Sequence, residues 1–280
     1  MICPKQLTYR KVIHIMTINT NQILDVMREA GKIMLRAHDM EDNENFQVKP
    51  GTTNFVTVYD VAVQTFLIEH FSQLFPDAVY FAEEKENEKD DALNAPLCFI
   101  IDPIDGTTNF MHNYCYSSIS VALLSRGEVI FGAVYNPFNN EMFHARRGEG
   151  AYLNERQIHV ADRPLDVAVV AMGTCPYYRD TLGENTFAFA RDLYFRGGDM
   201  RRTGSAALDI CGLAAGRNDV FCELILSPWD YAAGSLIVSE AGGYLAQTDG
   251  TPLAFDHPCP VLGGTPRVWE ELLQMAAKYV

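Results

Sequence analysis

The chain has 280 residues, and its 36 Asp and Glu exceed its 22 Lys and Arg, which leaves a formal charge of −14 at pH 7. This acidic excess argues against nucleic acid or an anionic membrane surface as the main partner, because both are bound by basic faces. A content of 48% hydrophobic and 21% charged residues is ordinary for a globular chain with a sizeable core. An anionic substrate would require positive charge from another source.

The cysteine pattern and the N-terminal residues indicate the cellular compartment of the protein. The seven cysteines are odd in number, scattered and without a CxxC pair, which is typical of reduced thiols in a cytoplasmic protein. No apolar run approaches the ~18 residues of a spanning helix. Residues 1–15 lack the apolar stretch of a signal peptide, so we interpret them as an N-terminal extension. A weak boundary near residues 161–164 predicts one subdomain over 16–160 and a second over 161–280.

The first half of the chain predicts helices and strands in alternation. Apolar residues at helical spacing predict a helix over 23–34, with capping residues at 19–21, and the polar segment 39–51 is predicted as a loop. Asp60 lies where a strand turns into a second helix. The elements predicted after the loop are strand 55–58, helix 61–75 and strands 79–81, 98–101, 117–124 and 129–135.

The second half continues the mixture. Gly148 and Gly150 mark a hairpin near Tyr152, and Gly242 with Gly243 ends a helix, as C-cap glycines do. Strands and helices are mixed throughout, which indicates an α+β or mixed α/β fold. The elements predicted here are strand 167–172 and helices 183–193, 206–215, 232–241 and 268–279.

The most informative stretch is IDPIDGTTNF at residues 101–110, where an apolar strand delivers Asp102 and Asp105, three residues apart. Two Asp on one turn can share hard cations, which take oxygen ligands including backbone carbonyls. Gly106 and Thr107 would then offer backbone N–H groups at a helix start, where a phosphate can bind. An acidic surface turn with a helix cap is the alternative interpretation of the same spacing.

Three further carboxylate groups lie where a strand or loop enters a turn, which is where sites collect in mixed folds. They are Asp60, the pair Glu83 and Glu84, and Asp230. Alone, each has an ordinary explanation: a helix cap for Asp60 and Asp230, and a solvated charge run for the glutamates. The sequence contains no GxxxxGK[ST] P-loop, no GxSxG motif of serine hydrolases and no HExxH motif of zinc proteases, so the residues for these three chemistries are missing.

At these positions the sequence resembles the inositol monophosphatase family of magnesium-dependent sugar phosphatases. DPIDGTTNF at 102–110 is similar to the first signature of that family, and WDYAAG at 229–234 is similar to the second. The resemblance covers roughly residues 20–270 and implies a layered αβαβα sandwich of two subdomains with the site between them. Further segments fit in order and spacing at 57–60, 82–84, 148–154, 204–207 and 240–243.

The resemblance implies a site with two to three Mg²⁺ ions. Glu83, Asp102 and the carbonyl of Ile104 would hold one ion, and a third, weaker ion would lie near Glu83. Asp102, Asp105 and Asp230 would hold the second. Such ions would also explain how an acidic protein binds an anionic substrate.

The resemblance also assigns catalytic and substrate-binding roles. Thr107, oriented by Asp60, would activate a metal-bound water, with Glu83 as a further catalytic residue. The N–H groups of Gly106 and Thr107 would cradle the phosphate. The residues implied to contact the rest of the substrate are Lys49, Thr174, Ala206, Glu223 and Asp230, of which Glu223 would bind ring hydroxyls.

The function that these features indicate is Mg²⁺-dependent, lithium-sensitive hydrolysis of inositol monophosphate in a homodimeric cytoplasmic enzyme. Two alternatives stay open. Arg201 and Arg202 could meet a second phosphate, as in a fructose-1,6-bisphosphatase or NADP phosphatase, although such arginines more often form surface or interface ion pairs. The fold could also serve a regulatory or scaffold protein that binds a macromolecular partner.

Overall fold

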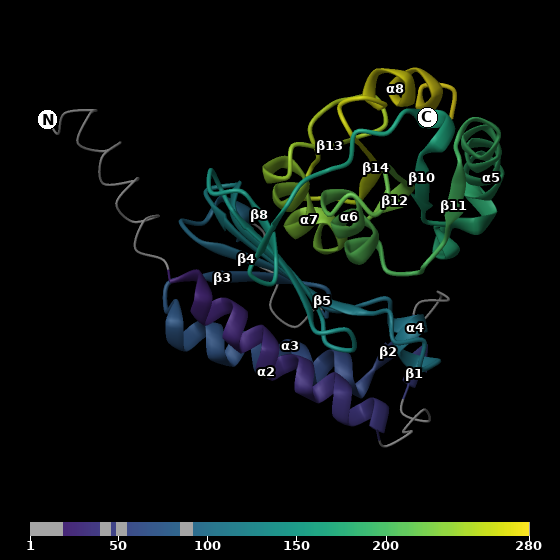
Figure 1. The fold of residues 1–280 in the computed structure, drawn as a ribbon. Helices are drawn as coiled ribbons and strands as arrows, with labels where there is room; N and C mark the ends of the chain where they lie inside the picture. Colours follow the sequence, from purple (N-terminus) through teal and green to yellow (C-terminus); the bar gives the residue numbers. More distant parts are fainter. Residues whose placement is uncertain (1–18, 40–45, 49–54, 85–91, 280) are drawn as a thin grey trace, which may run out of the picture.

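The computed structural model describes residues 19–39, 46–48, 55–84 and 92–279 (Figure 1). Its elements form five layers in the order helices, sheet, helices, sheet, helices, which confirms the predicted αβαβα sandwich. The predicted N-terminal extension and Lys49 lie outside the described residues. The predicted division at residue 160 stays a prediction.

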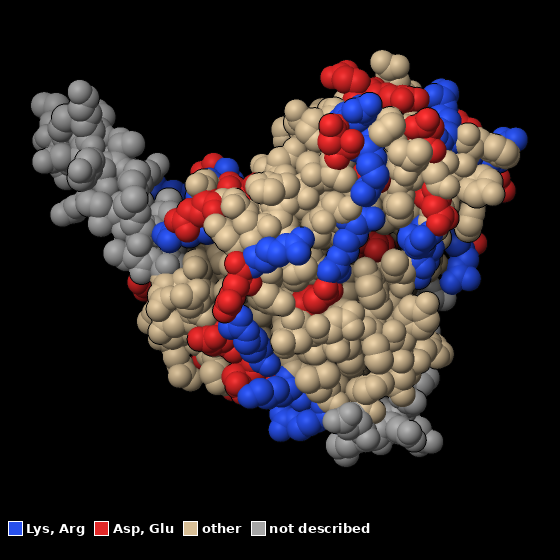
Figure 2. Space-filling view, in the orientation of Figure 1, with Lys and Arg blue, Asp and Glu red and all other residues tan. Residues whose placement is uncertain are grey.

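The first layer contains two helices, α2 (Thr20–Asp39) and α3 (Val58–Leu74), which pack against each other and against one face of the larger sheet. The apolar side of α2 is buried at Ile23, Met27 and Met34, as its helical spacing predicts. On the opposite side, Arg28 pairs with Asp25 and Lys32 with Glu29. On the face drawn in Figure 2, basic and acidic side chains therefore lie next to one another rather than in separate fields.

The larger sheet has seven strands in sequence order, of which the first two are parallel and the others antiparallel. Its second strand is buried along its whole length, because helices cover both faces. The strands are β3 (Val79–Ala82), β4 (Cys98–Asp105), β5 (Ser118–Ser125), β6 (Glu128–Asn136), β7 (Glu141–Arg146), β8 (Ala151–Leu153) and β9 (Arg156–Ile158).

The smaller sheet has five strands in the order β11-β10-β12-β14-β13, and α5 (Arg179–Arg196) and α8 (Trp269–Ala276) cover its outer face. β10 is parallel to β11 and β12, whereas β14 joins in antiparallel orientation. The strands are β10 (Val169–Met172), β11 (Asp199–Arg201), β12 (Val220–Leu226), β13 (Tyr244–Ala246) and β14 (Cys259–Gly264).

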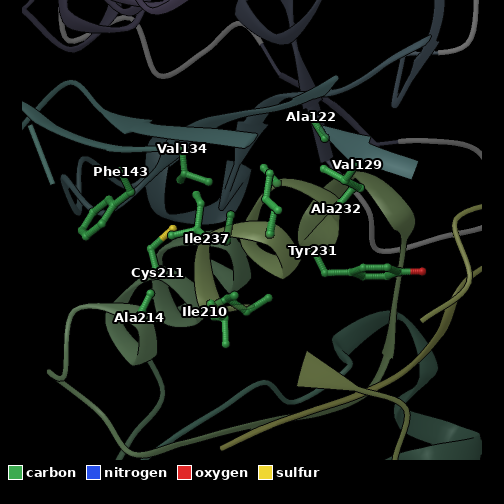
Figure 3. Packing of buried hydrophobic residues seen from close by; sticks show 14 of the residues in the cluster. Ala122, Val129, Val134, Phe143, Ile210, Cys211, Ala214, Tyr231, Ala232 and Ile237 are labelled. Carbon is green, nitrogen blue, oxygen red and sulfur yellow. The ribbon is translucent and has the colours of Figure 1, made fainter. Parts of the chain in front are cut away.

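The central helices α6 (Ala206–Ala214) and α7 (Pro228–Glu240) lie between the two sheets and share one hydrophobic core with both. Figure 3 shows Val134 and Phe143 of the larger sheet facing Cys211 of α6 and Ile237 of α7. The helix and sheet approach closely: a Cβ added at Gly132 would lie 2.5 Å from the carbonyl oxygen of Ala233. This contact fixes α7 over β5 and β6, next to the end of β4.

Several small elements complete the chain. β1 (Phe46–Val48) pairs with β2 (Phe55–Thr57) in a two-stranded sheet, and α4 (Thr107–Met111) follows β4 directly. Three single turns of 3₁₀ helix lie at Ala92–Asn94, Leu165–Val167 and Pro176–Tyr178. Within the described residues, no helix is both long and apolar enough to cross a bilayer.

Several boundaries predicted from the sequence were wrong, among them that of helix 183–193, which runs from Arg179 to Arg196 as α5. The predicted loop 39–51 contains β1, whose hydrogen bonds come from the distant β2. The predicted strand 98–101 continues to Asp105 because β5 pairs with it as far as Ser118, across a register shift. The predicted helix 232–241 begins at Pro228, so Asp230 lies inside its first turn rather than in front of it. Besides β1, five strands were not identified from the sequence, namely β7, β11, β12, β13 and β14.

Candidate metal centre and active site

The end of β4 brings Asp102 and Asp105 close to the starts of α6 and α7. The register shift against β5 falls between these residues, and the Ile104 N–H donates to Asp102 Oδ1 at 3.0 Å. Asp230, at the start of α7, completes a cluster in which carboxylate oxygens of all three residues lie within 4.8 Å of one another. The structure therefore brings together three of the predicted metal ligands.

This cluster is electrostatically costly by itself. Burial raises the pKa of Asp102 and Asp230 well above the usual range, and repulsion from the neighbouring acids raises it further. Burial also raises the pKa of Asp105, to about 6. Ionised carboxylates this close and this buried require a compensating cation. A donor set made of carboxylate oxygens fits a hard divalent cation such as Mg²⁺.

Asp105 is held by the start of α6. The N–H groups of Ala206 and Ala207 donate to its carboxylate at 3.2 and 3.1 Å, and the hydroxyl groups of Ser205 and Ser118 also donate to it. These hydrogen bonds favour the ionised form and oppose the effect of burial on the pKa of Asp105. The helix from the second half of the chain thus orients a ligand from the first half.

Asp60 and Asp230 occupy equivalent places in their helices. The sequence suggested both as caps, but the residues at the cap positions are Thr57 for α3 and Ser227 for α7. Asp60 Oδ2 accepts the Thr57 N–H at 2.7 Å, and Asp230 Oδ2 accepts the Ser227 N–H at 2.8 Å. Each carboxylate is thereby fixed in the first turn of its helix.

Thr107 connects Asp60 to the metal cluster. Its hydroxyl oxygen lies 3.3 Å from Asp60 Oδ1 and 3.1 Å from the carbonyl oxygen of Ile104. Asp60 is only 1% exposed, and burial raises its pKa to about 6, while the Thr57 hydrogen bonds lower it. A buried carboxylate behind a hydroxyl at the edge of a cavity is suited to accept a proton through that hydroxyl.

These residues line a cavity of about 560 Å³. Asp60 lies behind the cavity wall, Thr174 lies outside the wall but accepts a hydrogen bond from the wall residue Arg202, and Lys49 is outside the described residues. The predicted site residues in the wall are Glu83, Asp102, Ile104, Asp105, Gly106, Thr107, Ala206, Glu223 and Asp230.

Glu223 lies in the same cavity as the cluster, on β12. Its Oε1 accepts the Cys175 N–H at 3.1 Å, and burial raises its pKa to about 7. A second acid in the cavity wall is Asp209 of α6, and burial raises its pKa to about 7 as well. The positive charge of Arg202 lowers the pKa of both acids. The cavity thus offers acidic acceptors together with the guanidinium groups of Arg179 and Arg202, a combination that suits a hydroxylated, polar molecule.

Several residues that take part in this site were not identified from the sequence. Ser205 holds Asp105, and Cys175, Tyr177 and Asp209 belong to the cavity wall. Asp209 had a detectable signal, because it is the single charged residue in the otherwise apolar helix AALDICGLA. Cys175 and Tyr177 had no such signal, because they lie just before and within the single 3₁₀ turn Pro176–Tyr178, which is too short to show periodicity.

Comparison with known proteins agrees with this geometry. Nus factor SuhB of Pasteurella multocida is 34% identical over 255 residues, which cover 90% of this chain and 93% of that protein. Nus factor SuhB of Escherichia coli K12 is 34% identical, over 88% and 91% of the two chains.

Solved structures agree as well. Extragenic suppressor protein suhB from Bartonella henselae superposes with a TM-score of 0.85 and 32% identity, covering 93% of this chain and 99% of that one. The IMPase of Thermotoga maritima superposes with a TM-score of 0.82 and 30% identity, covering 91% of this chain and 95% of that one. The sequence model of the inositol monophosphatase family matches residues 19–279. The chain therefore belongs to the inositol monophosphatase family.

Proposed function

We propose that this protein is a Mg²⁺-dependent phosphomonoesterase that hydrolyses inositol monophosphate, of the myo-inositol 1-phosphate type, to inositol and phosphate. The observation that carries the proposal is the arrangement of one cavity. One cavity is lined by three clustered carboxylates that require a cation, two of them buried, by Thr107 with Asp60 behind it, and by a separate acid, Glu223.

The metal would be held by residues at the ends of β3 and β4 and at the start of α7. Glu83, Asp102 and the Ile104 carbonyl would hold one ion, Asp102, Asp105 and Asp230 a second, and a third would lie near Glu83. When bound, Mg²⁺ would neutralise these acids, attract the phosphate ester and acidify a water molecule.

The chain itself supplies orientation and proton transfer. Thr107 would take a proton from the attacking water and pass its own to Asp60, which is ionised above a pH of about 6. The N–H groups of Gly106 and Thr107 would donate to the phosphate oxygens. The leaving alcohol would lie toward Glu223, whose carboxylate can accept hydrogen bonds from ring hydroxyls, beside the small side chain of Ala206.

Asp105→Asn tests the metal site. We expect Mg²⁺ affinity and phosphate release from inositol 1-phosphate to fall by roughly a hundredfold or more, because the cluster loses a shared ligand. Asp77→Asn, at an exposed acid in the turn after α3, is the matched control and should behave as the parent. Calorimetric Mg²⁺ titration, a phosphate assay and circular dichroism measure binding, turnover and fold. Normal turnover by a folded Asp105→Asn protein would contradict the proposal.

A substrate panel decides between the branches of the family. Inositol 1-phosphate, fructose 1,6-bisphosphate and NADP are compared with Mg²⁺ present, with EDTA and Li⁺ as inhibitors. We expect the highest kcat/KM with inositol 1-phosphate and inhibition by both additives. A preference for either of the other two would replace the inositol assignment, with Arg202 as the residue that meets the additional phosphate.

A second role is favoured by the names of the relatives, which are Nus factors. We propose that the protein also binds a component of the transcription machinery, and that it forms a homodimer. Co-purification of tagged parent and tagged Asp105→Asn protein from native lysate separates partner binding from catalysis. The homodimer is tested by light scattering, which measures the mass of the protein in solution. A transcription component retained by both proteins supports the binding role, and its absence from both overturns it.

A further inference from the structure

A cysteine, a histidine and an asparagine form a cluster outside the metal centre, between the end of α2 and the loop after α4. Cys115 Sγ lies 3.8 Å from His38 Nε2, and His38 Nδ1 lies 3.1 Å from Asn113 Oδ1. The sulfur is also 3.5 Å from the Asn113 carbonyl oxygen. The His38 ring packs edge to face on Phe138, with centroids 5.5 Å apart. Three polar side chains from two distant segments thus meet in one chain of contacts.

The direction of the hydrogen bonds defines the tautomer of His38. Asn113 Oδ1 can only accept, so Nδ1 of His38 carries the ring proton and donates it. Nε2 then presents its lone pair toward the Cys115 thiol and can take the thiol proton. An oriented histidine beside a thiol is the arrangement that generates a nucleophilic thiolate.

The other cysteines of the described chain have a different environment. Cys98, Cys175, Cys211, Cys222 and Cys259 are buried, whereas Cys115 is half-buried. Burial raises the pKa of the Cys98 thiol to about 12 and that of Cys175 to about 11. Among the described cysteines, Cys115 is therefore the one whose residue is not buried, and its thiol has a base beside it.

We propose that Cys115 is a site of reversible thiol modification by small disulfides of the glutathione class, with His38 as the base. His38 Nε2 takes the thiol proton, and the Cys115 sulfur attacks one sulfur of the disulfide. The reagent S–S bond breaks as the new S–S bond forms, and the leaving thiolate takes the proton from His38. One thiol and one disulfide give one mixed disulfide and one thiol, so electrons and protons balance.

The modified loop is tied to the helix that carries Thr107. The Tyr114 N–H donates to the Asn109 carbonyl at 2.9 Å, and Asn109 Nδ2 donates to the Tyr116 carbonyl at 2.8 Å. The Ser117 hydroxyl donates to the Gly106 carbonyl at 2.9 Å. An adduct at Cys115 is therefore expected to displace α4 and lower phosphatase activity.

Mass mapping tests the modification without reference to any activity. Because Cys3 lies outside the described residues, the full chain carries Cys3→Ser and is exposed to glutathione disulfide. We expect one glutathionyl group, on the peptide that contains Cys115, and none after Cys115→Ser. Adducts spread over several cysteines, or absent from Cys115, would overturn the proposal.

The role of His38 is tested by rate. His38→Gln should slow adduct formation about tenfold, whereas His70→Gln, at a half-buried histidine of α3, should leave the rate unchanged. If His38→Gln melts below the parent, Asn113→Gly removes the Nδ1 partner and still permits the φ of +52° at this position. It should slow the reaction severalfold. Equal rates in the parent and in the folded variant would remove His38 from the reaction.

The effect on α4 is measured separately and rests on the proposed function. The glutathionylated protein should lose most of its Mg²⁺-dependent phosphate release and regain it with dithiothreitol, while the Cys115→Ser protein keeps full activity throughout. Full activity of the mapped adduct would overturn the link to α4 and leave the modification site standing. An inactive parent would contradict the proposed function and leave the mass mapping unaffected.

Discussion

Glu223 keeps its place in the cavity because residue 173 has no side chain. A Cβ added at Gly173 would lie 1.8 Å from Glu223 Oε2, far inside contact distance. The same carboxylate accepts the Cys175 N–H, so the backbone of one loop both makes room for the acid and holds it. A single glycine thus determines where the proposed acceptor for substrate hydroxyls lies.

Gly173→Ala should displace the Glu223 carboxylate and raise the KM for inositol 1-phosphate about tenfold. The kcat for a small aryl phosphate, which does not need Glu223, should change little, and strain in the cavity wall should cost about 1–3 kcal/mol of stability. Gly183→Ala is the control, because a Cβ at this position of α5 meets nothing within 4 Å. Steady-state kinetics measure KM and kcat of the two variants, and thermal melts measure their stability. An unchanged KM in Gly173→Ala would contradict the role of Gly173 in placing Glu223.

At the scale of elements, the start of α3 both begins a helix and positions an active-site acid. The Thr57 hydroxyl accepts the N–H groups of Tyr59 and Asp60 at 3.1 and 3.3 Å, and the Asp60 carboxylate accepts from Thr57 in return. The other oxygen of Asp60 faces Thr107. The capping box therefore links the stability of α3 to the proton path of the proposed reaction.

Thr57→Ala should destabilise the protein by about 1 kcal/mol through loss of the cap. It should also lower kcat about tenfold with KM unchanged, because Asp60 loses a partner that orients it. Thr57→Ser keeps the hydroxyl and should retain both stability and kcat. Denaturant unfolding and phosphate-release kinetics distinguish the two variants. If the alanine and serine variants had the same kcat, the cap would have no part in orienting Asp60.

For the whole molecule, the buried acids make stability depend on pH and on metal. Burial raises the pKa of Asp60 and Asp105 to about 6, and that of Asp209 and Glu223 to about 7, against ordinary values of 3.8 for Asp and 4.5 for Glu. The folded chain therefore binds more protons than the unfolded chain between a pH of about 4 and about 7. Stability from these groups is present at low pH and is lost as the pH rises through that window.

We expect the melting temperature of the metal-free protein to fall between pH 5 and pH 8. Added Mg²⁺ should raise it more at pH 8 than at pH 5, because the ion binds the ionised carboxylates of the folded chain. Differential scanning calorimetry in EDTA and in MgCl₂ measures both trends. Asp105→Asn should reduce the response to Mg²⁺. A melting temperature that rises from pH 5 to pH 8 in EDTA would show that other groups dominate the titration.

Local patterns in the sequence determined many elements and the core of the site. The helical spacing of Ile23, Met27 and Met34 placed α2, and the run ending in Asp102 placed β4, because periodicity follows directly from backbone geometry. The DPIDG stretch also indicated a metal site, since two acids on one turn suit a hard cation. Three-residue strands such as β11 and β13 are too short for periodicity to mark them.

Only the tertiary structure decided which acids meet and what surrounds them. The packing of α7 on β5 and β6 brings Asp230 to Asp102, and the start of α6 supplies the N–H donors of Asp105. These contacts join residues far apart in the chain, and the burial that raises their pKa values comes from both sheets together. A linear pattern records spacing along the backbone, whereas the distances and desolvation that make carboxylates into a metal centre arise only when the layers pack.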